Sequence, residues 1–285
     1  MPESAFILTL TSAPLPGIIA AVSTAIADLG GNITETQQHW DRPTDRFFLR
    51  VAFVGPQGLT DAAVEQSLAP TVGRFDLDLE VSDASRPPKI IVMVSKFDHA
   101  LLHLLYQIRV GWLHAEVTAI VSNHDDARRI AEHEGIRFVY LPVTPETKPA
   151  QEAALLALVE ETGVETVILA RYMQVLSDDL SRKLSGRAIN IHHSFLPAFK
   201  GANPYKQAYQ RGVKLIGATG HYVTSDLDEG PIIEQDIARV SHADTAEDLV
   251  AIGRDTESRV LARAVKLHVE RRVLLCGNRT VVFGK

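Results

Sequence analysis

Cysteine is almost absent from this chain, since Cys276 is the only one among 285 residues. A single cysteine excludes an internal disulfide and a cysteine-rich zinc site, and it fits a reducing compartment. Basic residues are also few, because 29 Lys and Arg stand against 35 Asp and Glu and give a formal net charge of −6. Proteins that bind the phosphate backbone of nucleic acids usually have surfaces rich in Lys and Arg, so no nucleic-acid partner is expected.

Long apolar runs are missing as well. Charged residues, prolines or glycines interrupt each apolar segment before the ~20 residues that a membrane-spanning helix needs, so no membrane partner is expected. The first residues, Met1-Pro2-Glu3-Ser4, lack the basic stretch of a signal peptide, and Pro14 and Pro16 break the apolar segment behind them. These absences predict a cytoplasmic protein.

The residues that are present predict two domains. Hydrophobic residues make up 46% of the chain and charged residues 22%, which is a folding composition and not a disordered one. The segment 85–89 contains Pro87-Pro88, a pair that fits neither a helix interior nor a central strand. We therefore expect a domain at 1–84, a linker at 85–89 and a second domain at 90–285.

The first domain has the pattern of a small sheet with two helices. Apolar residues at helical spacing predict helices, and period-two alternation, as in 75–81, predicts strands. The expected order is strand, helix, strand, strand, helix, strand, which is the ferredoxin-like βαββαβ arrangement. The expected elements are 5–11, 17–29, 33–40, 47–54, 60–72 and 75–81.

The second domain alternates short apolar strands with helices. This rhythm predicts an α/β fold, with a Rossmann-like, mostly parallel sheet and helices on both faces. The expected strands are 90–94, 117–121, 138–140, 167–169 and 188–192, and the expected helices are 99–109, 125–133, 149–161 and 245–270. The tail adds apolar runs at 273–275 and 281–283.

The end of strand 188–192 carries a polar pair. Asn190 and His192 share a face of the strand, and the carboxyl end of a parallel strand commonly borders a ligand cleft. An amide can donate to a developing oxyanion, and an imidazole can donate or shuttle a proton. The alternative is that both are local turn or capping residues. His193 and His221 lie nearby in sequence, but adjacent histidines on a strand point to opposite faces, so no metal site is expected.

A second polar segment is the acidic loop that Gly230-Pro231 closes. It contains Asp226, Asp228 and Glu229. Such a loop is either a solvated turn or a device that holds one carboxylate against His192, where it helps to activate water.

Together the two segments resemble the folate-dependent formyltransferase family. The shared pattern is Asn190-x-His192-x-Ser194-x-Leu196-Pro197, then Gly201, then Asp228-x-Gly230-Pro231-Ile232, and the resemblance covers 89 to about 283. It implies a formyltransferase-type sheet with Asn190, His192 and Asp228 as the catalytic trio.

The resemblance also implies a substrate pocket. The segment 170–177 matches the part of the family that lines the pterin pocket, and 223–227 resembles the loop that closes over the pterin ring. Alternatively, Met173, Val175 and Leu176 are ordinary core, and His193 simply packs. The expected substrate-binding residues are Met173, Gln174, Val175, Leu176, His193, Ser194, Val223, Ser225 and Asp226.

The acceptor is expected to be water. Glycinamide ribonucleotide transformylases carry a glycine-containing phosphate loop after the first strand, whereas here Ser95-Lys96-Phe97-Asp98-His99 has no glycine and Asp98 would repel phosphate. Methionyl-tRNA formyltransferases continue into a nucleic-acid-binding domain, while this chain ends near the end of the core. Formyl transfer to an amine such as glycinamide ribonucleotide remains the alternative, and a non-catalytic folate or amino-acid binder is a further one.

The first domain resembles an ACT domain, and the combination resembles the formyltetrahydrofolate deformylase family. That family implies hydrolysis of 10-formyltetrahydrofolate to formate and tetrahydrofolate, which feeds formate to purine synthesis and balances one-carbon pools, with no cofactor or metal. Gly17 and Asn32 keep positions that ACT domains use for an amino-acid effector, although the turn before Gly17 lacks the usual acid. The alternative role is oligomerisation, and side-by-side pairing of sheets predicts a homo-oligomer, dimeric or higher.

Overall fold

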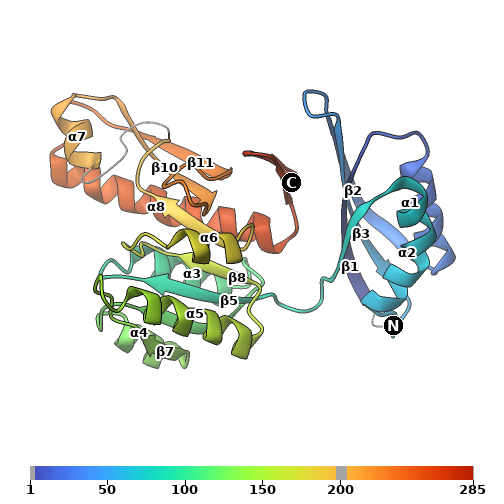
Figure 1. The fold of residues 1–285 in the computed structure, drawn as a ribbon. Coiled ribbons are helices and arrows are strands. Elements are labelled where there is room, and N and C mark those ends of the chain that lie inside the picture. Colours follow the sequence, from blue (N-terminus) through green and yellow to red (C-terminus); the bar gives the residue numbers. More distant parts are fainter. Residues whose placement is uncertain (1–3, 197–203, 285) are drawn as a thin grey trace. The chain divides into compact units, whose positions relative to one another are not determined.

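The computed structural model describes residues 4–196 and 204–284, so Pro197 and Gly201 of the formyltransferase pattern lie outside the described residues. The chain forms two compact units (Figure 1). Unit 1 joins Met1–Pro87 to Glu270–Lys285, and unit 2 is Pro88–Val269. The boundary at Pro87 falls within the expected linker, but the expected second domain at 90–285 is too long, because its last residues pack on unit 1.

Unit 1 is built on a four-stranded antiparallel sheet in the order β2-β3-β1-β4. Figure 1 shows helices α1 and α2 against one face of this sheet. The apolar side chains of both helices and of alternate strand residues form one core. This is the ferredoxin-like arrangement that the sequence predicts. Its elements are β1 (Ser4–Ser12), α1 (Ile18–Asp28), β2 (Asn32–Asp41), β3 (Arg46–Gly55), α2 (Asp61–Phe75) and β4 (Asp78–Asp83).

The boundary between α2 and β4 differs from the expectation. The alternation of apolar residues predicts a strand from Phe75, but the helix continues through Phe75 and ends at Asp76, which takes the left-handed conformation with φ 50°. Phe75 then belongs to the buried core as a helical residue. The period-two pattern misleads here because the first apolar residue of the strand run lies in the last helical turn.

The opposite face of the sheet in unit 1 is covered by the end of the chain. The strands β12 (Val273–Cys276) and β13 (Arg279–Val282) form an antiparallel hairpin. Three residues of this segment pack with Phe48 of β3, namely Leu274, Cys276 and Phe283. Phe48 alternates with the strand residues that face α1 and α2, so its side chain lies on the other face. This packing is the physical reason why the tail belongs to unit 1.

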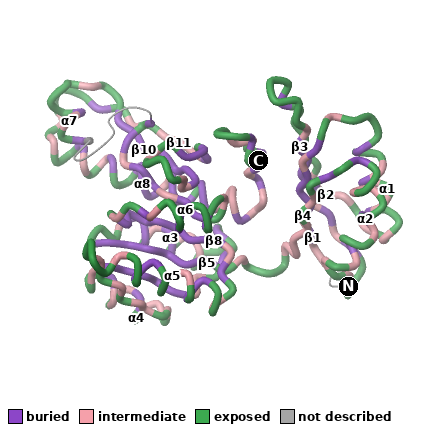
Figure 2. Tube along the Cα trace, viewed as in Figure 1, coloured by how far each residue is buried: buried purple, intermediate pink, exposed green. Residues whose placement is uncertain are grey.

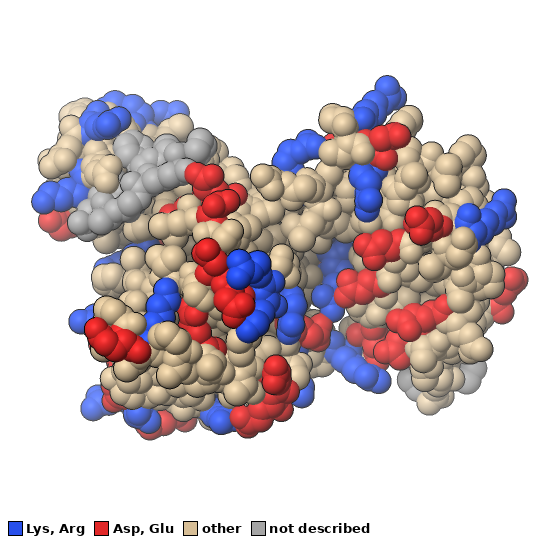
Figure 3. Space-filling view, in the orientation of Figure 1, with Lys and Arg blue, Asp and Glu red and all other residues tan. Residues whose placement is uncertain are grey.

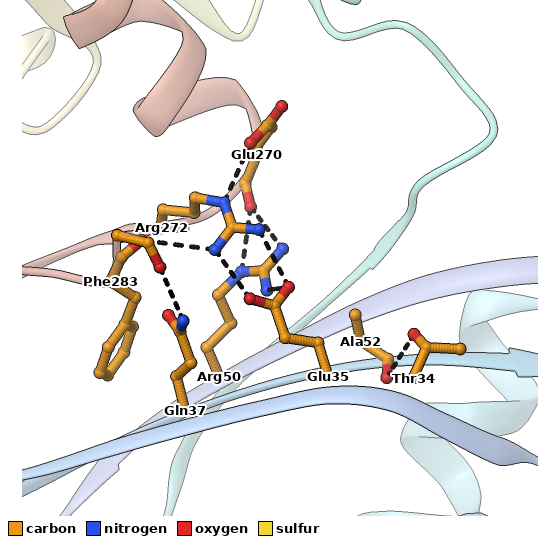
Figure 4. Close-up of polar contacts among 9 residues, drawn as sticks. Thr34, Glu35, Gln37, Arg50, Ala52, Glu270, Arg272 and Phe283 are labelled. Atoms are coloured by element: carbon orange, nitrogen blue, oxygen red, sulfur yellow. Dashed lines mark hydrogen bonds and ion pairs between the residues drawn. The ribbon is translucent and has the colours of Figure 1, made fainter.

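A cluster of charged residues fastens the same segment (Figure 4). Glu35 on β2 accepts hydrogen bonds from Arg50 at 2.8 Å and from Arg272 at 2.9 and 3.0 Å. Arg50 also donates twice to the backbone carbonyl of Glu270, at 3.0 and 3.1 Å. Both guanidinium groups are buried, and Glu35 lies between them.

Unit 2 contains a seven-stranded sheet in the order β11-β10-β9-β8-β5-β6-β7. All pairings among β5 to β9 are parallel, while β10 and β11 add an antiparallel edge. The mostly parallel sheet is therefore confirmed, and β10 and β11 are strands that the sequence pattern did not predict. The strands are β5 (Lys89–Val94), β6 (Glu116–Ser122), β7 (Arg137–Tyr140), β8 (Thr166–Leu169), β9 (Ala188–His192), β10 (Leu215–Tyr222) and β11 (Ile232–Arg239).

The helices of unit 2 bury the sheet on both faces. Residues from α5 and α6 share one apolar cluster with alternate residues of the central strands, whereas α3 packs against α8. Figure 2 shows the central strands as buried, and Ile90 through Val94 are fully inaccessible. The helices are α3 (His99–Arg109), α4 (Arg128–Glu134), α5 (Lys148–Thr162), α6 (Asp178–Lys183), α7 (Pro204–Gln210) and α8 (Ala246–Val269).

Two observations concern the surface. On the face that Figure 3 shows, acidic and basic side chains of the described residues are interspersed on each unit. Across the ranges 4–196 and 204–284, none of the helices combines the length and the apolar character needed to cross a membrane.

The strand order creates a crevice in unit 2. From β5 the chain runs outward to β6 and β7, and then crosses back to β8 on the other side of β5. The loops that leave the carboxyl ends of β5 and β8 therefore diverge, and ligands of open α/β sheets bind at such a switch point.

Candidate active site

A cavity of about 550 Å³ opens in unit 2 at the carboxyl edge of the parallel strands. The strand β9, the loop from β8 to α6 and the loop from β10 to β11 form one part of its wall. Residues of α7 and α8 complete the lining. The exposed surface of its lining is mostly apolar, although more than half of the lining residues carry polar groups, and this combination suits a small-molecule site.

The three expected catalytic residues meet in this cavity. Nδ1 of His192 lies 3.1 Å from Oδ1 of Asp228, although 36 positions separate them in the sequence. Asn190 lies two residues before His192 on the same face of β9, and its Nδ2 is 3.2 Å from Nε2 of His221. Nε2 of His192 is buried and has no hydrogen-bond partner among the described residues. This nitrogen is therefore available to a ligand.

His221 was expected to be near the site only by its place in the sequence, and the sheet gives it a defined role. It lies directly opposite Asn190 in the pairing of β9 with β10. Its Nδ1 is 2.9 Å from the carbonyl of Tyr222, which can only accept, so Nδ1 carries the proton. Burial lowers the pKa of His221, so Nε2 is an unprotonated acceptor at neutral pH. The amide NH₂ of Asn190 donates to it, and the second N–H of that amide stays available.

The loop between β10 and β11 holds Asp228 by an unusual backbone path. Asp228 has φ 57°, a left-handed conformation that is uncommon for residues other than glycine and costs energy. Gly230 follows, and a Cβ atom there would lie 1.7 Å from the carbonyl oxygen of Tyr222. The amide of Tyr222 donates to the carbonyl of Pro231 at 2.9 Å, which closes the loop at its base. The Gly230-Pro231 pair thus turns Asp228 back toward β9.

The charge states follow from burial and neighbours. Burial works against the ionised form of Asp228, but the hydrogen bond from His192 and the nearby histidines outweigh it and keep the pKa of Asp228 below its ordinary value. Burial, helped by the positive charge of Arg171, lowers the pKa of His193 to about 4. At neutral pH the site therefore combines a carboxylate at Asp228 with a neutral ring at His193.

Eight of the nine expected substrate-binding residues line the cavity, and Ser194 does not. Met173 and Val175 are 52% and 55% exposed, so the alternative that they are ordinary core is wrong for these two, while Leu176 does belong to the core. Ser194 is buried, and its carbonyl accepts from Thr219. The lining residues are Met173, Gln174, Val175, Leu176, His193, Val223, Ser225 and Asp226.

The loop from β8 to α6 is anchored at both ends. The hydroxyl of Ser95 accepts from the amide of Met173 at 3.0 Å and donates to Asn123 at 2.7 Å. At the other end Ser177 caps α6, and its amide and hydroxyl both donate to Glu152. These bonds present the exposed apolar side chains of the loop to the cavity without burying them.

Part of the cavity wall was not predicted as a site. Glu257 on α8 accepts from the hydroxyl of Tyr205 at 2.5 Å and lies 2.8 Å from Nε2 of His99. Gly253 and Leu261, four residues before and after Glu257 on α8, are both buried. An acidic residue on the buried face of an amphipathic helix was therefore the sequence feature that could have indicated a site here. Arg171, which lies in the predicted pocket segment 170–177, also lines this part.

The expected effector residues lie apart from this site, in unit 1. Gly17 precedes α1 with φ 97° and lines a shallow groove between α1 and α2. The lining of that groove does not include Asn32, an exposed residue at the start of β2. The structure therefore does not bring the two residues together in one described cavity.

No group of three or more His, Cys, Asp or Glu side chains within the described ranges has the arrangement of a metal site. The expectation that the reaction needs no metal stays a prediction.

Comparisons with known proteins show which proteins this chain is similar to. The profile of the formyl transferase family matches residues 88–265. A formyltetrahydrofolate deformylase of Corynebacterium sp. (strain P-1) is 48% identical over 97% of this chain and 97% of its own. The crystal structure of a formyltetrahydrofolate deformylase from Burkholderia mallei ATCC 23344 matches with a TM-score of 0.94 at 48% identity, covering 99% of this chain and 100% of that chain.

A glycinamide ribonucleotide transformylase from Symbiobacterium toebii matches less of the molecule. Its TM-score is 0.65 at 32% identity, and the match covers 70% of this chain and 95% of that chain. The deformylases match both units, whereas the transformylase leaves almost a third of the chain unmatched. Because the formyl transferase profile matches unit 2 and the deformylases are similar over nearly the full length, the chain belongs to the formyltetrahydrofolate deformylase family.

Proposed function

We propose that the protein hydrolyses 10-formyltetrahydrofolate to formate and tetrahydrofolate, with Asn190, His192 and Asp228 as the catalytic residues. The observation that carries this assignment is the 3.1 Å contact between His192 and Asp228 inside the cavity. Membership of the deformylase family supports the reaction. The roles of the individual residues rest on their geometry.

The two apolar loops of the cavity bind the pterin end of the substrate. Met173 and Val175 come from one loop and Leu227 from the other, and all three side chains are more than half exposed. Exposed apolar side chains around a concave site favour a flat aromatic ring, which covers them. The polar side chains of Ser225 and Asp226 on the second loop are placed to meet polar groups at the edge of the ring.

The chemistry follows from the polar groups at the base of the cavity. Asp228 positions a water molecule and takes part in its deprotonation as the water oxygen bonds to the formyl carbon. The free N–H of Asn190 and the Nε2–H of protonated His192 donate to the oxyanion that forms on that carbon. The ionised Asp228 stabilises the positive ring of His192, as a carboxylate does for a catalytic imidazole. The C–N bond then breaks, N10 takes the proton that Asp228 helped to remove from water, and the formic acid loses its own proton to solvent and leaves as formate.

Formyl transfer to an amine such as glycinamide ribonucleotide is the alternative, and it is not favoured. The segment after β5, Ser95-Lys96-Phe97-Asp98-His99, offers no glycine-rich turn for a phosphate. Phe97 instead projects into the cavity lining, where it stacks with the guanidinium of Arg254 at 5.1 Å. A bulky side chain at this position supports a small acceptor such as water.

The function is tested by incubating the pure protein with 10-formyltetrahydrofolate in buffer without amines and measuring formate. Formate release without an added acceptor is expected. Release only after glycinamide ribonucleotide is added would establish a transferase, and tight binding without release would establish a folate-binding protein.

The role of Asp228 is tested by Asp228→Asn, which keeps the shape of the side chain but removes its charge. We expect kcat to fall at least about a hundredfold, because general base and electrostatic contributions are of this size, while folate binding is retained. Glu229→Gln is the matched control, since it removes an exposed charge one residue away that does not line the cavity. Near-normal turnover of Asp228→Asn would reject the assignment.

We also propose that unit 1 makes the protein a homo-oligomer. Its sheet ends in β2 and β4, whose outer edges have no neighbouring strand within the described part of the chain. Free sheet edges pair readily with another copy. Light scattering on the purified protein is expected to give a mass of two or more chains, and adding free amino acids during the deformylase assay tests whether unit 1 also binds an effector.

A further inference from the structure

Arg171 has a backbone conformation that its residue type does not favour. It lies in the loop that leaves β8, and its φ of 63° is in the left-handed region. A residue other than glycine pays roughly 1 kcal/mol or more for this conformation. Glycine would avoid the cost, so the side chain of Arg171 must contribute something that compensates for it.

The guanidinium of Arg171 lines the catalytic cavity and is incompletely bonded. The side chain is 9% exposed, and its Nε and Nη1 atoms are buried without a hydrogen-bond partner among the described residues. Glu257 is its ion-pair partner, with Oε2 at 3.5 Å from Nε. The two oxygens of Glu257 are already engaged by His99 and Tyr205. Buried charged donors without acceptors are costly, which points to an anion as the missing partner.

The charges around Arg171 favour a small anion at this end of the cavity. Arg254 and Lys206 line the same wall, and both Arg171 and Arg254 stack on the ring of Phe97, at 5.5 and 5.1 Å. Glu257 is the carboxylate that opposes these three cations in the described lining of this wall. Asp226 and Asp228, which also line the cavity, come from the separate loop between β10 and β11.

Arg171 also lies close to the catalytic groups. Its positive charge contributes to the low pKa of His193, after the larger effect of burial. The ring of His193 in turn contacts the ring of His192, with centroids 5.1 Å apart. An anion held by Arg171 would therefore lie in the same cavity as the formyl carbon, which water attacks beside His192 and Asp228.

We propose that Arg171 binds the carboxylate of formate, the product that leaves the formyl carbon. This inference rests on the proposed hydrolysis. Formate is an anion with two oxygens, and guanidinium groups bind carboxylates through charge-assisted hydrogen bonds. The step involves no covalent change at Arg171: the C–N bond has broken, N10 has taken its proton, and the ionised product moves onto the guanidinium.

The test compares formate binding in matched variants. Initial rates of 10-formyltetrahydrofolate hydrolysis are measured against sodium formate, with sodium chloride at equal ionic strength as the salt control. Formate is expected to inhibit the parent protein more strongly than chloride. Arg171→Met is expected to raise the inhibition constant for formate at least tenfold, and Arg171→Lys is expected to lie between the two. Arg239→Met removes an exposed charge on β11 that does not line the cavity, and its inhibition constant is expected to stay within threefold.

If the Arg171 variants are inactive, formate binding is measured directly instead of through inhibition. Line broadening of ¹³C-formate by the intact protein is measured by NMR, after thermal unfolding has shown that each variant folds. Broadening that Arg171→Met abolishes and Arg239→Met preserves supports the proposal. Equal broadening by the parent and by Arg171→Met overturns it, as does inhibition by formate no stronger than by chloride. Failure of the parent protein to release formate at all would instead overturn the proposed function.

Discussion

His193 links the stability of unit 2 to pH. Its pKa is lowered from 6.5 to about 4, so between these values the unfolded chain binds a proton that the folded protein does not. The free energy of unfolding therefore falls as the pH decreases through this window, by at most about 3 kcal/mol. His193→Gln is expected to remove this part of the dependence, which urea unfolding of unit 2 between pH 7 and pH 4 measures.

The control for this experiment is His242→Gln, because His242 is an exposed residue of the same unit. Its curve of unfolding free energy against pH is expected to run parallel to that of the parent. A His193→Gln curve that is also parallel to the parent would show that the ring is accessible to protons in the folded state.

The sequence predicted some residues of the site and missed others. The resemblance to formyltransferases predicted Asn190, His192 and Asp228 as a trio, whereas the residue pattern alone left open which carboxylate of the loop faces His192. Arg171 was predicted only as part of the segment 170–177 and Glu257 was not predicted, since their pairing depends on one cavity that joins the end of β8 to α8 across the fold. A local pattern carries no information about which buried charge faces which.

The loop between β10 and β11 depends on glycine at position 230. Any Cβ atom there would meet the carbonyl of Tyr222 at 1.7 Å, so the backbone must shift and move Asp228 away from His192. Gly230→Ala is expected to lower kcat/KM by at least about a hundredfold, since displacement by 1 Å can cost that much. It is also expected to destabilise unit 2, as the thermal unfolding temperature will show.

Gly73→Ala is the matched control for the substitution. Gly73 lies in α2, is exposed, and has no atom within 4 Å of an added Cβ. Alanine there is expected to stabilise unit 1 by about 0.5–1 kcal/mol, because helices favour alanine over glycine, and to leave hydrolysis unchanged. Full activity of Gly230→Ala would show that the loop can hold Asp228 along another path.

Glycine also explains why two strands were not predicted. In β10, a Cβ at Gly217 would lie 2.6 Å from the carbonyl of Asp236, and one at Gly220 would lie 2.8 Å from Cβ of Ala264. Both glycines are there because β11 and α8 pack closely against the strand. In the sequence the same residues resemble turn signals, so tertiary packing outweighs local propensity in this segment. The long helix at 245–270 was predicted to within one residue at each end, although it contains Gly253.

The chain leaves unit 1 at Pro87 and returns to it at Glu270, so unit 2 is inserted between two parts of unit 1. The predicted domain boundary missed this return, because the hairpin of β12 and β13 is short and its partners are more than 200 positions away in the sequence. Stability of unit 1 therefore depends on a contact between segments that are distant in the chain. Formation of that contact closes a loop as long as the whole catalytic unit.

Glu35 is the residue on which this return depends. Its carboxylate neutralises Arg50 and Arg272, whose side chains are only 3% and 5% exposed. The substitution Glu35→Gln removes this shared carboxylate. Two buried guanidinium groups would then repel each other, so unit 1 is expected to lose roughly 2–4 kcal/mol of stability. The hydrogen bond from Arg272 lowers the pKa of Glu35 against the opposing effect of burial, so the stability of unit 1 is expected to fall as the pH decreases from the ordinary glutamate pKa of 4.5 through the lowered pKa of Glu35. Hydrogen exchange of the amides in β2, β3, β12 and β13 measures the effect, with the exposed Glu65→Gln on α2 as the control. Faster exchange in β12 and β13 alone would mean that the tail hairpin detaches while the sheet stays folded. Unchanged exchange in all four strands would show that the apolar contact with Phe48 holds the tail without the charges.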